Sequence, residues 1–241
     1  MKTFTFRALL LAAAVLGPLR VAAESKTVHV EVPGTLPELL TTEEKENLTS
    51  LTVSGSLNGT DIGLIAKMAG ASMASSAGTS VVGDLTELNL QDARIVAGGD
   101  YYAGIPGRQY YTQDDVFPTF SFVESKLTSV VLPSSIKAVG QSVFAYNENL
   151  SSVTFTCELD SIGAHAFQDC SQLLVITLPT VHYIGDQAFL NCSFLDFSIP
   201  DGLDSLGNYV FRECQSLREL HLPASVVKMG EGVFSNCKHL R

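Results

Sequence analysis

Five units of nearly constant length follow one another from Leu127 to the C-terminus. Each unit contains a glycine, and these glycines recur every 22 or 23 residues. A phenylalanine follows each glycine by four positions. The pairs are Gly140 and Phe144, Gly163 and Phe167, Gly185 and Phe189, Gly207 and Phe211, and Gly230 and Phe234. A repeat this regular predicts a solenoid, in which each unit stacks only on its neighbours.

Each unit opens with a leucine and two alternating apolar positions, as in Leu127, Val130 and Leu132. This alternation predicts a short strand with one buried face, and stacked units would pair these strands in parallel. Proline has no N–H to donate to such a ladder, so it marks the end of the strand in four units. These prolines are Pro133, Pro179, Pro200 and Pro223. The glycine is expected at a turn, where it allows positive φ or a close neighbouring backbone. The phenylalanines are expected to form a column in the core.

A second column lies three residues after each phenylalanine, with asparagine in the first unit and cysteine in the others. Its members are Asn147, Cys170, Cys192, Cys214 and Cys237. Neighbouring positions in a parallel stack lie about 4.8 Å apart, which is compatible with disulfides. Asparagine and cysteine occupy the same position in different units, which instead favours unbridged thiols. The small polar side chain at this buried position would then interact with the turn. A straight column of identical side chains does not suit a tetrahedral zinc site. Cys157 lies outside the column and is either free or paired outside the chain.

The unit LxxVxLPxxhxxIGxxAFxxC, with h apolar, resembles the BspA-like subfamily of leucine-rich repeats from Leu127 to Arg241. The second unit departs from the pattern by placing Thr156 where proline is expected. The resemblance implies a right-handed leucine-rich-repeat solenoid with a parallel β-sheet on the concave face and short helices or turns on the convex side. Similar proteins occur on the surfaces of anaerobic mouth and gut bacteria and in some protozoan parasites. The resemblance therefore implies adhesion to host or bacterial surface proteins through the repeat face.

The N-terminal third is less regular. Residues 1–23 read as a secretory signal, because a basic start precedes an apolar run too short to span a bilayer. Residues 24–47 are expected to cap the solenoid, with a strand over 27–33 and a helix over 37–47.

Residues 48–126 predict two irregular leucine-rich units. A helix is expected over 60–69, with Thr60 or Asp61 as N-cap and Gly70 as C-cap. A flexible loop is expected over 71–83. Regular units fill 127–241, and the chain stops just inside a sixth unit, which predicts a fragment of a longer protein.

The charge balance limits the classes of partner. The chain carries 15 basic and 25 acidic residues, and removal of the signal would remove three basic residues, which leaves 12 against 25. So acidic a chain argues against nucleic acid and anionic membrane surfaces. No segment after the signal has the length of apolar sequence that membrane insertion of the mature chain requires. No catalytic motif or acid–base pair appears, and no cofactor or metal is expected, since the Asp114–Asp115 pair is interpreted as solvated.

The remaining candidate sites are surfaces for an extracellular protein ligand. Two outward positions of each predicted strand are expected on the concave face: Ser129, Val131, Ser152, Thr154, Val175, Thr177, Asp196, Ser198, Glu219 and His221. Four tyrosines, Tyr101, Tyr102, Tyr110 and Tyr111, lie on a glycine-rich loop between residues 98 and 118. They either contribute to recognition or pack over the solenoid where irregular and regular units meet. A secreted or cell-surface binding module is the expected function, and a structural stalk of a larger surface protein is the alternative.

Overall fold

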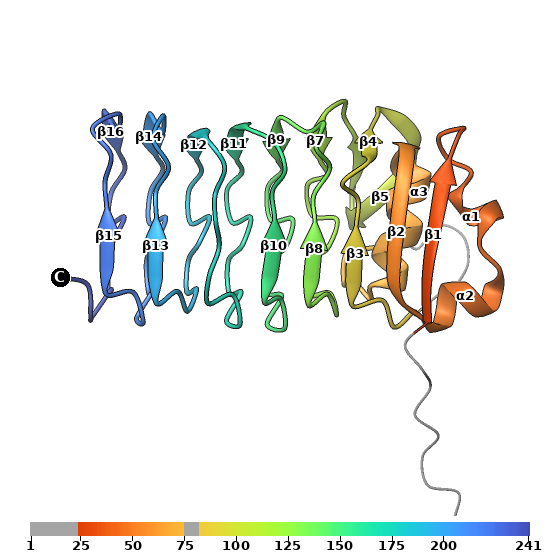
Figure 1. Ribbon diagram of the computed structural model, residues 1–241, viewed down its shortest axis with the longest axis horizontal. Coiled ribbons are helices and arrows are strands. Elements are labelled where there is room, and N and C mark those ends of the chain that lie inside the picture. Colours follow the sequence, from red (N-terminus) through yellow and green to blue (C-terminus); the bar gives the residue numbers. More distant parts are fainter. Residues whose placement is uncertain (1–23, 75–81) are drawn as a thin grey trace, which may run out of the picture.

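The structure, a computed structural model, describes residues 24–74 and 82–241. The expected signal over residues 1–23 and part of the expected loop over 71–83, residues 75–81, lie outside the described residues. The units stack into an elongated solenoid, with the N-terminal units at one end and the C-terminal units at the other (Figure 1). The solenoid predicted from the repeat is confirmed.

One side of the solenoid carries a ladder of parallel strands, which we call the first ladder. Its strands are β1 (Glu24–Val30), β2 (Leu48–Leu57), β3 (Glu87–Asn89), β8 (Ser129–Val131), β10 (Ser152–Thr154), β13 (Asp196–Ser198) and β15 (Glu219–His221). β4 (Ala93–Ile95) pairs with the far end of β2. The ladder is interrupted in the third regular unit, where residues 175–178 form no strand and make no backbone hydrogen bond to any described residue. The strand expected over 27–33 ends earlier, at Val30.

A second ladder of parallel strands, not expected from the sequence, is formed mostly by the short segments that come directly before the repeated glycines. Its strands are β7 (Val116–Phe117), β9 (Ala138–Val139), β11 (Leu159–Ile162), β12 (Val181–Ile184), β14 (Ser205–Leu206) and β16 (Lys228–Met229). A glycine follows each of these strands except β7, and it packs against the neighbouring unit. A Cβ atom at Gly163 would lie 2.7 Å from the backbone nitrogen of Gln141. Close approach of backbones, rather than positive φ, therefore requires glycine here.

Turns form the convex side of the regular units, and no helix occurs between residues 127 and 241. Their backbone groups bond to the next unit. In the third unit the N–H groups of Gln187, Phe189 and Asn191 donate to carbonyls one unit further on, at 2.8, 3.0 and 2.8 Å. Gln187 and Asn191 both have φ of 56°, which turns their N–H groups toward that neighbour. The turns of successive units thus form a third ladder of hydrogen bonds. This ladder pairs backbone N–H and C=O groups that a helix would have paired internally.

The phenylalanine column is confirmed as core. Phe144, Phe167, Phe189 and Phe211 have no exposed surface, and Phe234 is half-buried at the end. Ring centroids of successive members lie 5.3 to 5.8 Å apart, with interplanar angles of 5° to 20°. Phe122 extends the column toward the N-terminus, 5.9 Å from Phe144. The rings therefore run as one offset stack through the solenoid.

The cysteine column is confirmed as unbridged. All five cysteines are free, and Cys170, Cys192 and Cys214 are buried. The Sγ atoms of Cys192 and Cys214 lie 3.1 Å from the carbonyl oxygens of Phe167 and Phe189, one unit back. Asn147 donates in the same way to the Phe122 carbonyl at 2.6 Å. The shared donor explains why asparagine and cysteine exchange at this position. Cys157 is half-buried and donates to the carbonyls of Pro133 and Ile136.

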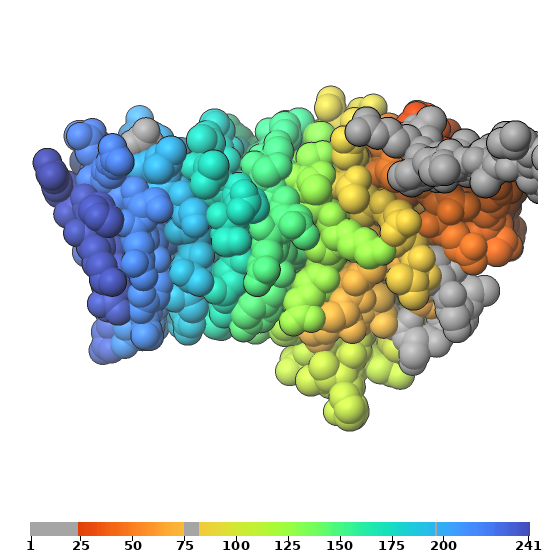
Figure 2. Space-filling view, turned by 90° about the horizontal axis from the view of Figure 1, so that it is seen from below, coloured from red at the N-terminus to blue at the C-terminus, as the bar shows by residue number. Residues whose placement is uncertain are grey.

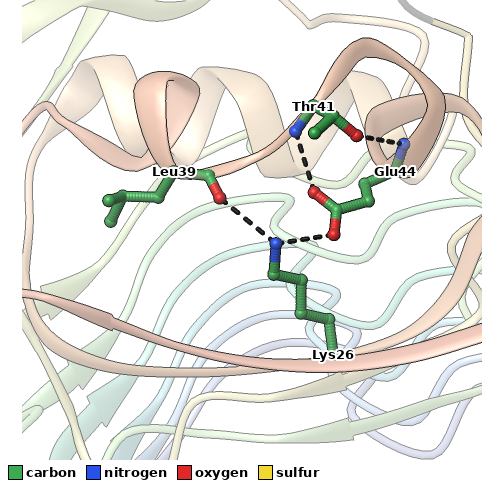
Figure 3. Close-up of polar contacts among 4 residues, drawn as sticks. All are labelled: Lys26, Leu39, Thr41 and Glu44. Atoms are coloured by element: carbon green, nitrogen blue, oxygen red, sulfur yellow. Dashed lines mark hydrogen bonds and ion pairs between the residues drawn. The ribbon is translucent and has the colours of Figure 1, made fainter.

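The segment expected as one helix over 37–47 is two, α1 (Leu36–Leu39) and α2 (Thr42–Asn47). Thr41 separates them because its hydroxyl caps α2 by accepting from the Glu44 N–H, while the Glu44 carboxylate accepts from the Thr41 N–H. The Lys26 ammonium group on β1 donates to Glu44 at 2.6 Å and to the Leu39 carbonyl (Figure 3). This contact ties both helices to the outermost strand of the first ladder.

Helix α3 (Gly59–Met68) matches the expected helix over 60–69, but its caps differ from those predicted. Asn58, not Thr60 or Asp61, is the N-cap, and Ala69 is the C-cap, followed by Gly70 with positive φ. Asp61 completes a capping box from the third position of the helix. The N-cap expected from the sequence at Thr60 or Asp61 lies two or three residues after the N-cap in the structure, Asn58, which is the partner of Asp61 in the capping box.

The segment expected as a glycine-rich loop is an antiparallel hairpin, β5 (Gly98–Ile105) and β6 (Arg108–Thr112). Gly107 has φ of +83° in the connection, which glycine adopts without strain. β5 packs against α3, and the hairpin, in yellow-green, stands out from the body of the solenoid in Figure 2. Within the described residues, no helix has the length and apolar character needed to span a membrane.

Candidate functional site

Eight of the ten residues predicted for the concave face lie on strands of the first ladder, in two columns that are broken at Val175 and Thr177, where no strand forms. In the register of β8 and β10, Ser129 pairs with Ser152 and Val131 pairs with Thr154. At the C-terminal end, β13 and β15 place Asp196 beside Glu219 and Ser198 beside His221. Because the residue between each pair points into the core, both columns face outward. Of the side chains described, Ser129 and Val131 are half-buried, and the remainder are exposed.

The polar side chains of these columns are available to a ligand. No side chain of Ser152, Thr154, Thr177, Ser198, Glu219 or His221 takes part in a hydrogen bond or ion pair with any described residue. Hydroxyl groups can both donate and accept hydrogen bonds, so each column offers repeated hydrogen-bonding positions to a partner that lies along the ladder.

An apolar area lies where the first ladder is interrupted. Val175 is 67% exposed, and Leu174 and Leu195 beside it are 44% and 47% exposed. The N–H and C=O groups of residues 175–178, which have no backbone partner among the described residues, lie in the same place. The centre of the face therefore combines apolar side chains with unpaired backbone groups, between polar residues on both sides. An interface centre that is more apolar than its rim is typical of protein partners.

The structure extends the two columns beyond the predicted residues. The β2–β3 register places Ser50 beside Glu87 and Thr52 beside Asn89, and the β3–β8 register joins them to Ser129 and Val131. The leucine spacing at residues 48–53 and 85–90 already indicated strands, and extension of the outward positions through it would have found these four residues.

The four tyrosines separate into different environments, and Tyr101 is half-buried. Tyr102 is buried, and its hydroxyl donates to the Thr119 carbonyl at 2.8 Å, so it packs the hairpin onto the solenoid. Burial raises the pKa of the Tyr102 hydroxyl. Tyr110 is half-buried against Phe120, with ring centroids 4.8 Å apart. Tyr111 is 53% exposed. The packing interpretation therefore holds for Tyr102 and in part for Tyr110, whereas the Tyr111 ring faces solvent.

A cleft of about 420 Å³ lies between β6 and the solenoid. Residues of the hairpin form one wall, and the other wall includes Val116, Pro118, Thr119 and Gln141. The Arg108 guanidinium group lies over the Tyr110 ring, 5.1 Å from its centroid. The Tyr111 hydroxyl donates to the Gln109 side-chain carbonyl at 2.9 Å. The hairpin therefore presents ordered aromatic and amide groups beside the first regular unit.

Asp114 and Asp115 have structural partners. Asp114 accepts from the Ala97 N–H at 2.8 Å, and Asp115 pairs with the Arg94 guanidinium group at 3.2 Å. Among the described residues, no group of three or more histidine, cysteine, aspartate or glutamate side chains is arranged to hold a metal ion. The two aspartates therefore hold the segment before β7 in place.

The family model described as BspA type Leucine rich repeat region matches residues 182–241, which include the fourth and fifth regular units. The resemblance drawn from the repeat motif is thereby confirmed: the chain carries BspA-type leucine-rich repeats. A comparison with curated proteins finds no match.

Similar chains in solved structures include several that are described as leucine-rich-repeat proteins. They include the Leucine Rich Repeat protein of T. pallidum, with 29% identity, 48% of this chain and 66% of that chain covered, and a TM-score of 0.39. A leucine rich cell surface protein from Faecalibacterium prausnitzii has 22% identity, 61% and 53% coverage, and a TM-score of 0.44. A leucine-rich repeat protein from Bacteroides ovatus has 19% identity, 66% and 54% coverage, and a TM-score of 0.38. The matches span between 53% and 66% of the length of those chains.

Proposed function

We propose that the chain is a secreted or cell-surface binding module that takes an extracellular protein on the outward side of the first ladder. One observation carries the proposal: outward residues are in register within β8–β10 and within β13–β15, on both sides of the break, and six polar side chains of this face have no hydrogen-bond or ion-pair partner among the described residues. A face that only closed the core would have no need to align these groups with an exposed apolar centre at Val175.

The shape of this face favours a flat or extended protein surface as ligand. The side chains are mostly short, and the columns follow the long axis of the solenoid. Small-molecule sites are concave and enclose most of their ligand, whereas protein interfaces of standard size bury about 800 Å² per partner. The first ladder offers length and repeated hydroxyl groups, which suit the second kind of partner.

Location outside the cell is part of the same proposal. It is supported by the signal-like sequence of residues 1–23, which lies outside the described residues, and by the BspA-type repeats. The alternative is a stalk that only positions another part of a larger surface protein. The break in the ladder and its exposed leucines favour binding over the stalk, because a spacer gains nothing from exposed apolar area.

The experiment measures binding of the chain to a panel of immobilised matrix and serum proteins. The test variant is Thr154→Asp combined with Val175→Asp and Thr177→Asp. Val227→Asp is the matched control, since Val227 is 85% exposed and lies beside the second ladder. The proposal predicts saturable binding that the triple variant loses and the control retains. Failure of the chain to bind any member of the panel, or equal loss in both variants, would favour the stalk.

A further inference from the structure

We infer that the cleft between the β5–β6 hairpin and the solenoid is a second binding site, for a saccharide that carries a carboxylate. This site lies away from the first ladder and does not depend on the function proposed for that face. Its volume of about 420 Å³ falls in the range of small-molecule sites. Aromatic rings, amide groups and a single charged group line it.

The aromatic rings are held in fixed positions. Tyr110 packs on Phe120, and the Arg108 guanidinium group covers its ring from another side. The Tyr111 ring is open to solvent, while its hydroxyl is fixed by Gln109. The face of an aromatic ring is electron-rich and attracts partly positive hydrogen atoms. A pyranose ring presents such C–H groups on one face, so Tyr111 offers it a stacking surface at low cost in side-chain entropy.

The amide groups suit hydroxyl groups. The side chains of Gln113 and Gln141 line the cleft and make no hydrogen bond to any residue in the described ranges. Each amide offers donors on nitrogen and an acceptor on oxygen. Neighbouring sugar hydroxyls both donate and accept, so two free amides facing one cleft match them better than they match an apolar peptide side chain.

The charge of the cleft is opposite to that of the protein. The chain has 25 acidic and 15 basic residues, yet no aspartate or glutamate lines this cleft. Arg108 lines it and forms no ion pair with any described residue. A guanidinium group binds a carboxylate through two parallel hydrogen bonds, and this pairing is stronger than one between neutral groups. The preferred ligand is therefore a uronic acid or a sialic acid, which share a carboxylate on a hydroxylated ring.

The test measures binding of the chain to immobilised saccharides that end in glucuronic acid, in sialic acid, or in the neutral sugar glucose. Arg108→Gln removes the charge, and Tyr111→Ala removes the stacking surface. Arg218→Gln is the matched control for charge, since Arg218 is exposed at the other end of the solenoid. An acidic peptide serves as the competing class of ligand. Thermal unfolding of each variant shows that it is folded.

We expect the chain to bind at least one acidic saccharide. Comparison of the saccharides that end in glucuronic acid and in sialic acid identifies which acid is preferred. Affinity should fall at least about tenfold in Arg108→Gln and for the neutral sugar, as loss of one charged hydrogen-bonding partner implies. Tyr111→Ala should also weaken binding, because it removes the stacking surface. Arg218→Gln and the first-ladder triple variant should bind as the original chain does. Equal binding of neutral and acidic sugars, no effect of Arg108→Gln, or binding of the acidic peptide alone would overturn the inference.

Discussion

The Sγ atom of Cys192 lies 3.1 Å from the backbone carbonyl oxygen of Phe167, one unit earlier in the solenoid. The same contact recurs from Cys170 to Phe144, at 3.2 Å. Each thiol therefore spans a unit boundary beside the stacked phenylalanine rings, and it acts as a buried donor between neighbouring turns. The column stabilises the stack without a covalent bond.

Replacement of Cys192 by alanine should reduce stability. The change removes a buried donor and leaves a small cavity, so we expect the free energy of unfolding to fall by about 1–2 kcal/mol. Chemical denaturation of the variant and of the original chain measures the difference. Cys157→Ala, at the half-buried cysteine outside the column, is the control and should change stability less. Equal effects at both positions would show that the column has no special role.

The thiols should become a source of instability only at alkaline pH. Burial raises the pKa of the Cys214 thiol to about 12, from 9.0, and also raises those of Cys170 and Cys192. Because the folded pKa lies above the unfolded one, the contribution of the protonated thiol is complete below pH 9.0 and is lost as pH rises toward the folded value.

Alkylation of the native chain checks directly whether the buried thiols are protected. At pH 8 the buried thiols should remain unmodified by iodoacetamide, whereas the half-buried Cys157 and Cys237 should react slowly. Mass spectrometry of digested protein identifies the modified positions, and the unfolded chain provides the control in which all five react. Rapid alkylation of Cys192 in the folded chain would contradict the arrangement.

Truncation in the phenylalanine column tests the core. Phe189→Ala, in the middle of the stack, should lower the free energy of unfolding by about 3–5 kcal/mol, because a fully buried ring leaves a cavity. Phe234→Ala should cost less, since that ring is half-buried. Denaturant titration compares the two, and a loss below about 1 kcal/mol at Phe189 would exclude it from the core.

Asp61 should be needed for the N-terminal end. Its carboxylate has no exposed surface and accepts from the backbone N–H groups of Gly34, Leu36 and Asn58 at 2.6, 2.9 and 3.0 Å. Burial raises its pKa, while the three donors act in the opposite direction. Asp61→Asn turns an acceptor into a donor that faces these groups.

We expect Asp61→Asn to cost about 1–3 kcal/mol, the penalty for unsatisfied buried groups. Glu46→Gln is a control on the exposed side of α2 and should be nearly neutral. Denaturant titration of both variants measures the difference, and an unchanged midpoint for Asp61→Asn would show that the carboxylate does not join α3 to the cap.

The repeat sequence was sufficient to predict the solenoid, the first ladder and the phenylalanine core, because those residues recur in register and are apolar. The second ladder was missed since strands of two residues, such as Ala138–Val139, are too short to show alternation. The turn ladder depends on positive φ at residues such as Gln187, which have no fixed type from unit to unit.

The candidate sites were predicted less completely. Outward positions follow from alternation, so Thr154 could be placed, but the break that contains Val175 and Thr177 depends on how neighbouring units stack. The hairpin was predicted as a loop because its glycines weaken the strand pattern. Its two strands also lie outside the 22- or 23-residue repeat, so the repeat does not indicate that they pair. The separation of Tyr102 from Tyr111 depends on that pairing.

Hydrogen–deuterium exchange on the chain with a protein partner from the binding panel tests the central claim most directly. In the free chain, amides of residues 175–178 should exchange faster than those of β10, because they lack backbone partners among the described residues. Bound ligand should slow exchange at 175–178 and at the neighbouring strands of the first ladder, and leave β12 and β16 unchanged. Slower exchange confined to the second ladder or to the turns would contradict the account.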